Sequence, residues 1–339
     1  MFQPKTDEEM VGDLMPQNEA SFEKVRRVGK MGQKAVSFSQ PVLNKWLSSF
    51  LRHYIRYSPF TIGRTYCWER CSQHNKSFIT RIQHKSLIKG STEDLIQRYL
   101  YFFGMWEPNL TRFVRQRLTA GDVFVDVGAN IGYFSLLASG LVGKQGRILA
   151  FEASPTIYEL FLDNIVLNQC SNIVPHNIAA GDTIGTTPVF FSGEHNIGMT
   201  NTVQGLVGQF ETEVALLPLD TMISDTMWKK VRIVKIDVEG AEFSVVKGLR
   251  KLLEKKSNPN VEIVVEVNPN PLQLQGIDPA EILAFFQEFG FFPYFLKCNA
   301  GPDDYLSGQR QTHAAMITTA ITQQTDVIFS RQQREYLVL

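Results

Sequence analysis

Apolar residues in the second two-thirds of the chain follow two alternating spacings. Short continuous apolar runs predict buried strands, and runs spaced by three and four residues predict helices. The expected strands are residues 123–127, 147–151, 172–179, 231–236, 261–267, 291–296 and 326–330. The expected helices are 133–141, one opened by Ser154-Pro155, 241–255 and 278–289. Repeated strand–helix units with apolar strands predict an α/β fold, Rossmann-like, with a doubly wound and mainly parallel sheet.

The N-terminal third has a different pattern. The first forty residues are polar, which predicts a poorly ordered tail. Apolar residues then recur at helical spacing from Val42 to Ile55, with Lys45, Arg52 and Arg56 elsewhere on the wheel, and a second helical stretch covers 91–118. We therefore divide the chain into a tail (1–40), a basic helical region (41–100) and a Rossmann-like domain (101–339). Its irregular insertion at about 181–230, rich in Gly, Thr and Asn, is a candidate substrate loop or lid.

Charge separates the two ends of the chain, although 34 Lys and Arg balance 34 Asp and Glu overall. Residues 1–90 hold 15 basic and 7 acidic side chains, and 24–89 hold a single acid, Glu69. This stretch could bind a nucleic acid backbone, an acidic carrier protein, a phosphorylated glycan or lipid headgroups. We favour a helical cap that balances an acidic domain, and we do not expect nucleic acid as a partner. Likewise, the helix at 41–57 is expected to dock on the main domain, with association at a membrane surface as the alternative.

Cysteine usage points to a reducing compartment. The four cysteines are too few and scattered for a disulfide framework, and Met1 begins no signal-sequence pattern, so we expect a cytoplasmic location. The longest nearly uncharged apolar stretch, 131–143, is shorter than the ~20 residues that span a bilayer. Cys67, Cys71 and His74 have a spacing similar to metal-binding clusters. No fourth ligand is near them, so we expect structural thiols and no metal there.

The exit of the first strand carries a glycine-containing bend. Gly128, Asn130 and Gly132 are residues that tolerate a tight turn with positive φ. The second strand ends in Glu152, whose carboxylate could accept both hydroxyls of a ribose. However, the spacing is not that of a dinucleotide loop, and Asp126 precedes the first glycine. An acid there would repel a pyrophosphate and suit a cation, and S-adenosylmethionine has an ammonium, a sulfonium and no phosphate.

Acidic residues also follow the later strands. Asp237 and Glu239 point the same way on an extended chain, and Glu266 ends the next strand. Together they could act as a general base, hold the hydroxyls of an acceptor, or bind a divalent metal ion. Glu239 or Glu242 could instead cap a helix start. In the insertion, His195 could present a base to a hydroxyl, although an ordinary surface histidine fits equally well.

These segments resemble the FkbM family of S-adenosylmethionine-dependent methyltransferases. The matching segments are Asp126 to Phe134, Phe151 to Pro155, Asn164 to Asn168, Leu219-Asp220, Lys235 to Glu242 and, ahead of the first strand, Gly104 to Glu107. The resemblance covers about 103–296. It implies O-methylation of a sugar or polyketide-type small molecule, with S-adenosylmethionine as the methyl donor.

The same resemblance assigns roles to residues. It implies that Glu152 binds the ribose hydroxyls, that the bend from Asp126 to Gly132, including Ala129, surrounds the methionine portion, and that Ala180 to Asp182 lie beside adenine. Glu107 is counted among the cofactor-binding residues. Two other functions stay open: an NAD-dependent oxidoreductase, disfavoured by the glycine spacing and Asp126, and a degenerate, non-enzymatic docking module.

Overall fold

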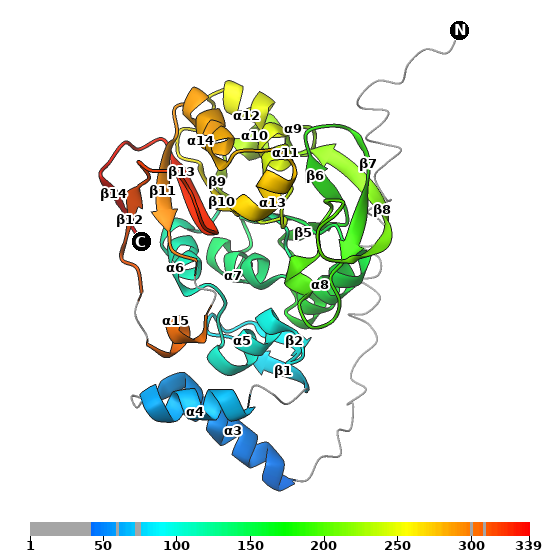
Figure 1. Cartoon of the computed structure of the whole chain (residues 1–339), viewed down its shortest axis with the longest axis vertical. Helices are drawn as coiled ribbons and strands as arrows, with labels where there is room; N and C mark the ends of the chain where they lie inside the picture. Colours follow the sequence, from blue (N-terminus) through cyan, green and yellow to red (C-terminus); the bar gives the residue numbers. More distant parts are fainter. Residues whose placement is uncertain (1–41, 59–60, 72–75, 299–300, 308–309) are drawn as a thin grey trace.

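A nine-stranded sheet forms the centre of the molecule (Figure 1). The computed structural model describes residues 42–58, 61–71, 76–298, 301–307 and 310–339. The sheet order is β14-β12-β11-β13-β10-β9-β3-β4-β5. Its strands are β3 (Val123–Val127), β4 (Arg147–Phe151), β5 (Ile173–His176), β9 (Val231–Ile236), β10 (Glu262–Val267), β11 (Phe292–Leu296), β12 (His313–Met316), β13 (Thr325–Ser330) and β14 (Tyr336–Val338).

The sheet has the expected parallel block and is extended at one side by antiparallel strands, so that as a whole it is mixed. The block from β5 to β10 is parallel, as the repeated strand–helix units predicted. In contrast, β13 inserts between β10 and β11 and is antiparallel to both, and β12 and β14 continue antiparallel. Between β11 and β13 the chain forms the short helix α15 (Pro302–Leu306) and strand β12, which pairs antiparallel with β11. An antiparallel neighbour needs no crossover helix.

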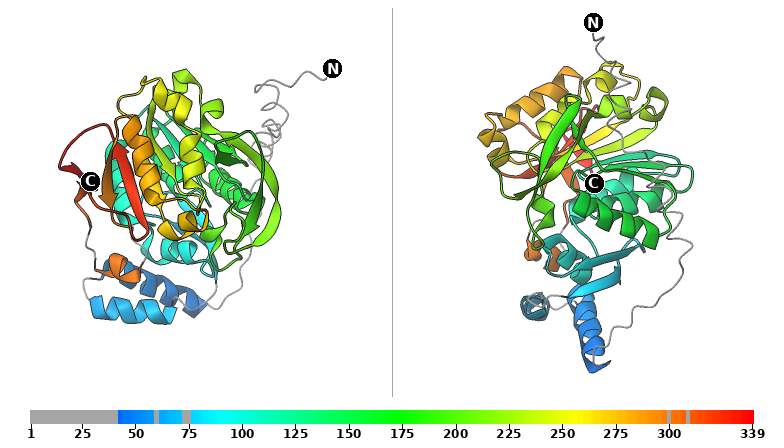
Figure 2. Two further views of the ribbon diagram at one scale, coloured as in Figure 1. Left: turned by 45° about the horizontal axis from the view of Figure 1, so that its top comes forward. Right: turned by 90° about the vertical axis from the view of Figure 1, so that its right-hand side faces the viewer.

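Helices cover both faces of the sheet (Figures 1 and 2). Helices α6 (Pro108–Arg117), α7 (Tyr133–Val142) and α8 (Pro155–Leu167) lie on one face, and α11 (Glu242–Lys247), α12 (Arg250–Glu254) and α14 (Pro279–Glu288) lie on the other. Within β3, Phe124 packs on the α7 side, while Val123 and Val125 pack on the α11 side. This alternation confirms the doubly wound arrangement.

Local signals explain where several helices begin and end. The Ser154 side chain accepts from the Ile157 N–H at the start of α8, and Asp278 and Glu281 form the expected capping box of α14. The single stretch expected over 91–118 is two helices, α5 (Leu95–Phe103) and α6, because Gly104 ends α5 with a left-handed φ of 74°. The expected helix 241–255 is likewise two, α11 and α12. The short helices α9 (Leu219–Met222), α10 (Asp225–Trp228) and α13 (Pro269–Leu274) were not expected.

The insertion is more regular than its composition suggested. It contributes most of a three-stranded sheet of order β6-β8-β7, formed by β6 (Ala179–Gly181), β7 (Gly185–Phe191) and β8 (Gln209–Pro218). A 3-10 turn, η1 (Ile197–Met199), lies between β7 and β8. The expectation of an irregular segment is therefore wrong for most of its length, because β7 and β8 pair antiparallel along the sheet.

The N-terminal region contains the expected helices and an unexpected hairpin. Helices α3 (Val42–Tyr57) and α4 (Thr61–Cys71) precede β1 (Ser77–Arg81) and β2 (Leu87–Ser91), which pair antiparallel. The domain boundary that was expected at residue 100 falls inside helix α5. The side chain of Asn164 on α8 accepts from the Lys89 N–H of β2 at 2.8 Å. Residues 1–40, His74 and the side chain of Cys71 lie outside the described residues, so the tail and the Cys67 cluster stay predictions.

The C-terminal end of helix α3 docks on the body of the molecule. Ile55 is fully buried, and the Arg56 guanidinium donates to the carbonyls of Phe102 at 3.2 Å and Tyr101 at 3.1 Å. Phe50, which belongs to the same predicted apolar stripe, is 65% exposed. Docking, the favoured alternative, is thus confirmed for this end of the helix. Within the part of the chain that is described, no helix combines the length and apolar character needed to cross a bilayer.

Candidate active site

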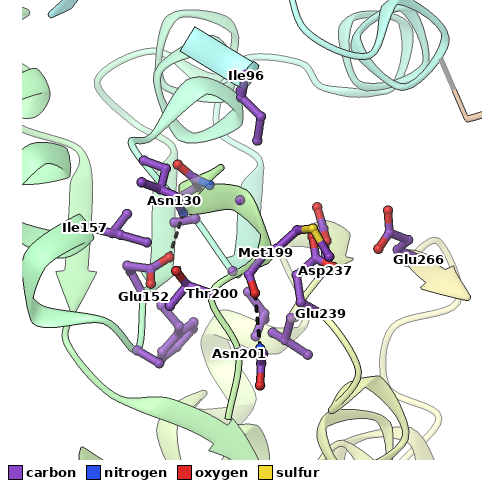
Figure 3. A pocket seen from close by; sticks show the side chains of 18 of the residues that line it. Ile96, Asn130, Glu152, Ile157, Met199, Thr200, Asn201, Asp237, Glu239 and Glu266 are labelled. Atoms are coloured by element: carbon purple, nitrogen blue, oxygen red, sulfur yellow. Dashed lines mark hydrogen bonds between the residues drawn. The ribbon is translucent and has the colours of Figure 1, made fainter. Parts of the chain in front are cut away.

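A cavity lies where the parallel strands end, as expected for ligand sites in open α/β sheets (Figure 3). Its walls come from the residues that follow β3, β4, β9 and β10 and from Leu95 and Ile96 of α5. Residues 196–202 of the insertion also line it. The Ile197 N–H donates to the Asp94 carboxylate at 2.9 Å, which ties this segment to the start of α5. The insertion therefore forms part of the cavity wall.

The bend after β3 has the backbone conformation that the sequence indicated. Gly128, Asn130 and Gly132 have φ values of 79°, 50° and 92°. At Gly128, a Cβ atom would lie 1.7 Å from the carbonyl oxygen of Asp237, so the bend and the end of β9 are in direct backbone contact. A Cβ on Gly132 would lie 2.3 Å from the Phe161 ring. Both glycines are required by close approach as well as by positive φ.

We expect Gly128→Ala to lower the free energy of unfolding by about 2 kcal/mol or more beyond the loss in Gly121→Ala. The two glycines have similar positive φ values, 79° and 92°, but Gly121 has no atom within 4 Å of an added Cβ. The comparison isolates the clash with Asp237 from backbone strain. Chemical denaturation of both variants measures it, and equal losses would show that the close approach is not needed.

Glu152 lies at one end of the cavity, beside the bend. Its carboxylate oxygens accept from the Asn130 N–H at 2.8 Å and the Ser154 N–H at 3.0 Å. Burial raises the pKa of Glu152 to about 7, although the hydrogen bonds from these two N–H groups act to lower it. Each carboxylate oxygen has a second lone pair, so the side chain can still accept from ligand hydroxyls.

Asp126 does not reach the cavity, which corrects its expected contact with the ligand. Strand alternation turns its side chain to the same face as Phe124, where Ser135 on α7 donates to its carboxylate at 2.6 Å. In the parallel pairing of β3 with β9, Asp126 lies opposite Lys235. Burial raises the pKa of Asp126, and the positive charge of Lys235 lowers it. Asp126 is therefore a buried partner of Lys235 and Ser135.

Two other expected site residues also lie away from the cavity. Asp182 pairs with Lys247 and accepts from the Ser244 hydroxyl at 2.9 Å, while Ala179 and Ala180 line the cavity in its place. The side chain of His195 is 81% exposed and has Glu93 as its neighbour, at 3.4 Å. Neither belongs to the cavity lining, so a role for His195 as a base at this site is not supported.

Three carboxylates meet at the other end of the cavity. Asp237, Glu239 and Glu266 each have an oxygen within 4.8 Å of the others, and all three line the cavity. Lys235 donates to Asp237 at 2.9 Å. Burial, followed by the charge of Asp237, raises the pKa of Glu239 to about 9. Glu266 accepts from Gln324 at 2.6 Å through one oxygen, and its other oxygen is buried without a partner.

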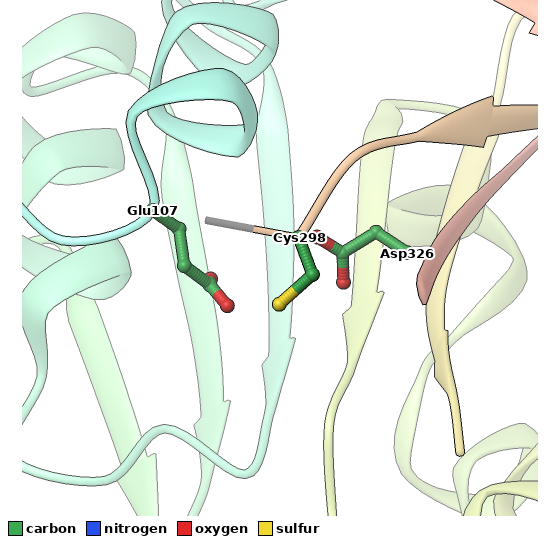
Figure 4. A group of neighbouring side chains, drawn as sticks. All are labelled: Glu107, Cys298 and Asp326. Carbon is green, nitrogen blue, oxygen red and sulfur yellow. The ribbon is translucent and has the colours of Figure 1, made fainter. Parts of the chain in front are cut away.

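A second cluster joins this acidic end (Figure 4). Glu107, Cys298 and Asp326 have ligand atoms within 4.8 Å of one another. Burial and the neighbouring Asp326 raise the pKa of Glu107 well above its usual value. In the antiparallel pairing of β10 with β13, Asp326 lies opposite Glu266, so the two clusters are continuous.

Sequence reasoning missed Asp326, Cys298 and Lys235. The signal for Asp326 and Lys235 was a charged residue inside an otherwise buried strand. Glu242, in contrast, behaves as the alternative anticipated: its carboxylate accepts from the Val238 N–H at 3.2 Å and the Gly240 N–H at 2.9 Å, just before α11.

We expect the melting temperature to fall by about 5 °C or more between pH 6.5 and 9. Burial raises the pKa of Glu152 and Asp326 to about 7 and of Glu239 to about 9. Each favours the folded state at low pH and loses that contribution as pH rises through its folded pKa. The buried His84 and His176, with pKa values of about 4, are neutral across this window. Calorimetric melts measure the change, and a flat or rising melting temperature would contradict these shifts.

The fold and the cavity together define a Rossmann-like methyltransferase. The parallel block carries a glycine bend after its first strand, an acid after its second and a cavity at the strand ends. The family described as the methyltransferase FkbM domain matches residues 126–293. Residues 126–293 thus form a domain of this family of S-adenosylmethionine-dependent methyltransferases. This assignment replaces the oxidoreductase and docking-module alternatives.

Several known proteins resemble the chain. Hexuronic acid methyltransferase AglP of Haloferax volcanii is 22% identical over 210 residues, covering 60% of this chain and 77% of the relative. Methyltransferase sdnD of Sordaria araneosa is 25% identical over 225 residues, covering 57% and 83%. The solved structure of M. jannaschii TYW2 in complex with AdoMet has a TM-score of 0.38 and 15% identity, covering 78% of this chain and 88% of that one. At that TM-score the structural likeness adds nothing to the assignment.

Proposed function

We propose that the protein transfers a methyl group from S-adenosylmethionine to a hydroxyl of a sugar or a polyketide-type small molecule. The observation that carries the proposal is one cavity with Glu152 and the glycine bend at one end and three carboxylates at the other. S-adenosylmethionine supplies a methyl group on a positively charged sulfur. The two ends of the cavity then correspond to binding of the nucleoside and activation of the acceptor.

The charge of the cavity fits this methyl donor. Its lining contains five carboxyl groups, those of Glu107, Glu152, Asp237, Glu239 and Glu266. Among the described lining residues, Lys235 is the only basic side chain. Acidic groups favour a sulfonium and an ammonium, because a nearby positive charge lowers their pKa and stabilises their ionised form, and they disfavour the pyrophosphate of a dinucleotide. The acidic lining as a whole, and not Asp126, therefore supports S-adenosylmethionine as the methyl donor.

The nucleoside end has the groups that an adenosine moiety needs. Glu152 is held by two backbone N–H groups, which fix its carboxylate toward the cavity for the ribose hydroxyls. Apolar side chains of Ile157, Ile178 and Val189 line the same cavity, and we assign them to the adenine ring. We assign the bend from Gly128 to Gly132 to the methionine portion, with Ala180 beside the base.

At the reacting end, the carboxylates are assigned to the acceptor. A hydroxyl that attacks a methyl group must lose its proton, and a carboxylate within hydrogen-bond distance can accept it. Asp237 is the best placed for this role. Its side chain is one-quarter exposed, so it reaches the cavity, and Lys235 donates a hydrogen bond to it at 2.9 Å. Glu239 and Glu266 are assigned to holding the other hydroxyls of the acceptor.

The acceptor class rests on the relatives and on this geometry. AglP is named as a methyltransferase of hexuronic acid, which supports a sugar acceptor. Several carboxyl groups close together suit an acceptor with several hydroxyl donors, as a sugar has. The cytoplasmic location stays a prediction.

A labelled-methyl screen tests the proposed function. The full chain is incubated with S-adenosylmethionine carrying a labelled methyl group and with fractions of sugar and polyketide extracts, with and without a chelator. We expect label in a hydroxyl-containing small molecule. Label in nucleic acid or protein alone would contradict the proposed acceptor class.

A further inference from the structure

The carboxylates at the reacting end of the cavity are arranged around a common point. Asp237 follows β9, Glu239 follows in the next turn with a φ of 55°, and Glu266 ends β10. One oxygen from each lies within 4.8 Å of the others. Metal–oxygen distances of about 2.1 to 2.6 Å allow ligand oxygens on opposite sides of one ion to be about 4 to 5 Å apart. The cluster therefore has the dimensions of a site for a single cation.

An unpartnered oxygen points to a missing ligand. Glu266 is 6% exposed, and Gln324 donates to only one of its two oxygens. The other oxygen is buried and has no hydrogen-bond partner, although the residue lines the cavity. A buried carboxylate oxygen without a partner is costly unless a proton or a cation occupies it.

The neighbouring side chains do not neutralise the cluster. Of the described residues that line the cavity, Lys235 alone is basic, and this lysine already lies between Asp237 and Asp126. Glu107, just before α6, and Asp326 of β13 face the cluster and add two more acidic side chains. The buried acids thus outnumber the buried cation several-fold, and the donor carries too few positive charges to balance them.

We propose that Asp237, Glu239 and Glu266 bind a divalent cation with a preference for oxygen ligands, such as Mg²⁺ or Mn²⁺, and that the acceptor hydroxyls complete its coordination. The role of the ion in methyl transfer rests on the proposed function. A cation bound to the acceptor hydroxyl lowers the pKa of that hydroxyl and holds it for attack. The set contains only carboxylates, which are ligands of hard cations, whereas the adjoining Glu107 cluster includes the Cys298 thiol.

The site can be tested without turnover by measuring Mn²⁺ binding. The electron paramagnetic resonance signal of free Mn²⁺ decreases as the protein binds the ion. We expect the full chain, saturated with S-adenosylhomocysteine, to bind about one Mn²⁺, which Mg²⁺ displaces. Asp237→Asn and Glu266→Gln should each weaken Mn²⁺ binding about 10-fold or more. If the thermal melt of Asp237→Asn or Glu266→Gln shows that the variant does not fold, Glu239→Gln is measured in its place.

Cys298→Ser and Asp163→Asn are the controls. The first alters the adjoining cluster without changing a carboxylate, and the second removes a carboxylate that lies outside the cavity lining. We expect both to keep Mn²⁺ affinity within about 2-fold of the original chain. No Mn²⁺ binding at millimolar concentration would overturn the proposal, as would loss in the controls with retention in Glu266→Gln. Calorimetry with S-adenosylhomocysteine on the same samples separates the two proposals, since a chain that binds Mn²⁺ but not this ligand keeps the metal site and loses the proposed function.

Discussion

Asp237→Asn is expected to reduce methyl transfer about 1000-fold, with S-adenosylhomocysteine affinity within about 2-fold of the original chain. The asparagine keeps the shape of the side chain but can neither accept a proton nor supply a negative charge. The backbone contact of Asp237 with Gly128 is unaffected, so the nucleoside end should stay intact. Initial rates with the labelled acceptor measure turnover, and calorimetry measures binding.

Asp163→Asn provides the control for this substitution. It makes the same chemical change in a half-exposed residue that pairs with Lys89, outside the cavity lining. We expect its methyl transfer rate to match that of the original chain. If Asp237→Asn instead lost ligand binding while keeping its rate at saturation, Asp237 would belong to the nucleoside site.

Glu152→Ala is expected to weaken S-adenosylhomocysteine binding about 100-fold or more. The substitution removes an acceptor for two ribose hydroxyls, and a hydrogen bond to a charged group contributes about 1.5–3 kcal/mol. It also releases the Asn130 and Ser154 N–H groups that Glu152 holds in place. Calorimetric titration gives the dissociation constants directly.

Glu211→Ala separates these contributions. Glu211 accepts from the Ser154 hydroxyl at 2.7 Å and the Thr156 N–H at 3.1 Å, so it holds the start of α8 without lining the cavity. We expect it to bind the ligand nearly as tightly as the original chain. Equal losses in both variants would mean that Glu152 acts by supporting the helix and not by contacting the ribose.

The sequence was most informative where one residue determined its own local structure. The continuous apolar runs at β3, β4 and β9 became parallel strands, and Gly128 and Gly132 adopted positive φ as expected. The capping residues Ser154 and Asp278 began the helices they were expected to begin. These features depend on contacts between near neighbours, which a single sequence records.

Features set by distant pairing were not predictable in the same way. Apolar runs look the same in parallel and antiparallel strands, so the insertion of β13 beside β10 had no signal. Asp126 was placed in the cavity because it precedes the bend, but strand alternation turns it toward α7. Asp326 joined the acidic end only through its pairing with Glu266, 60 positions away in the sequence.

Calorimetric titration of the full chain with S-adenosylhomocysteine and, separately, with NAD tests most directly that the acidic cavity is a methyl-donor site. We expect one equivalent of S-adenosylhomocysteine to bind and NAD to give no heat of binding, because five carboxyl groups face the cavity against one lysine. Binding of NAD without S-adenosylhomocysteine, or of neither, would contradict the assignment of this cavity.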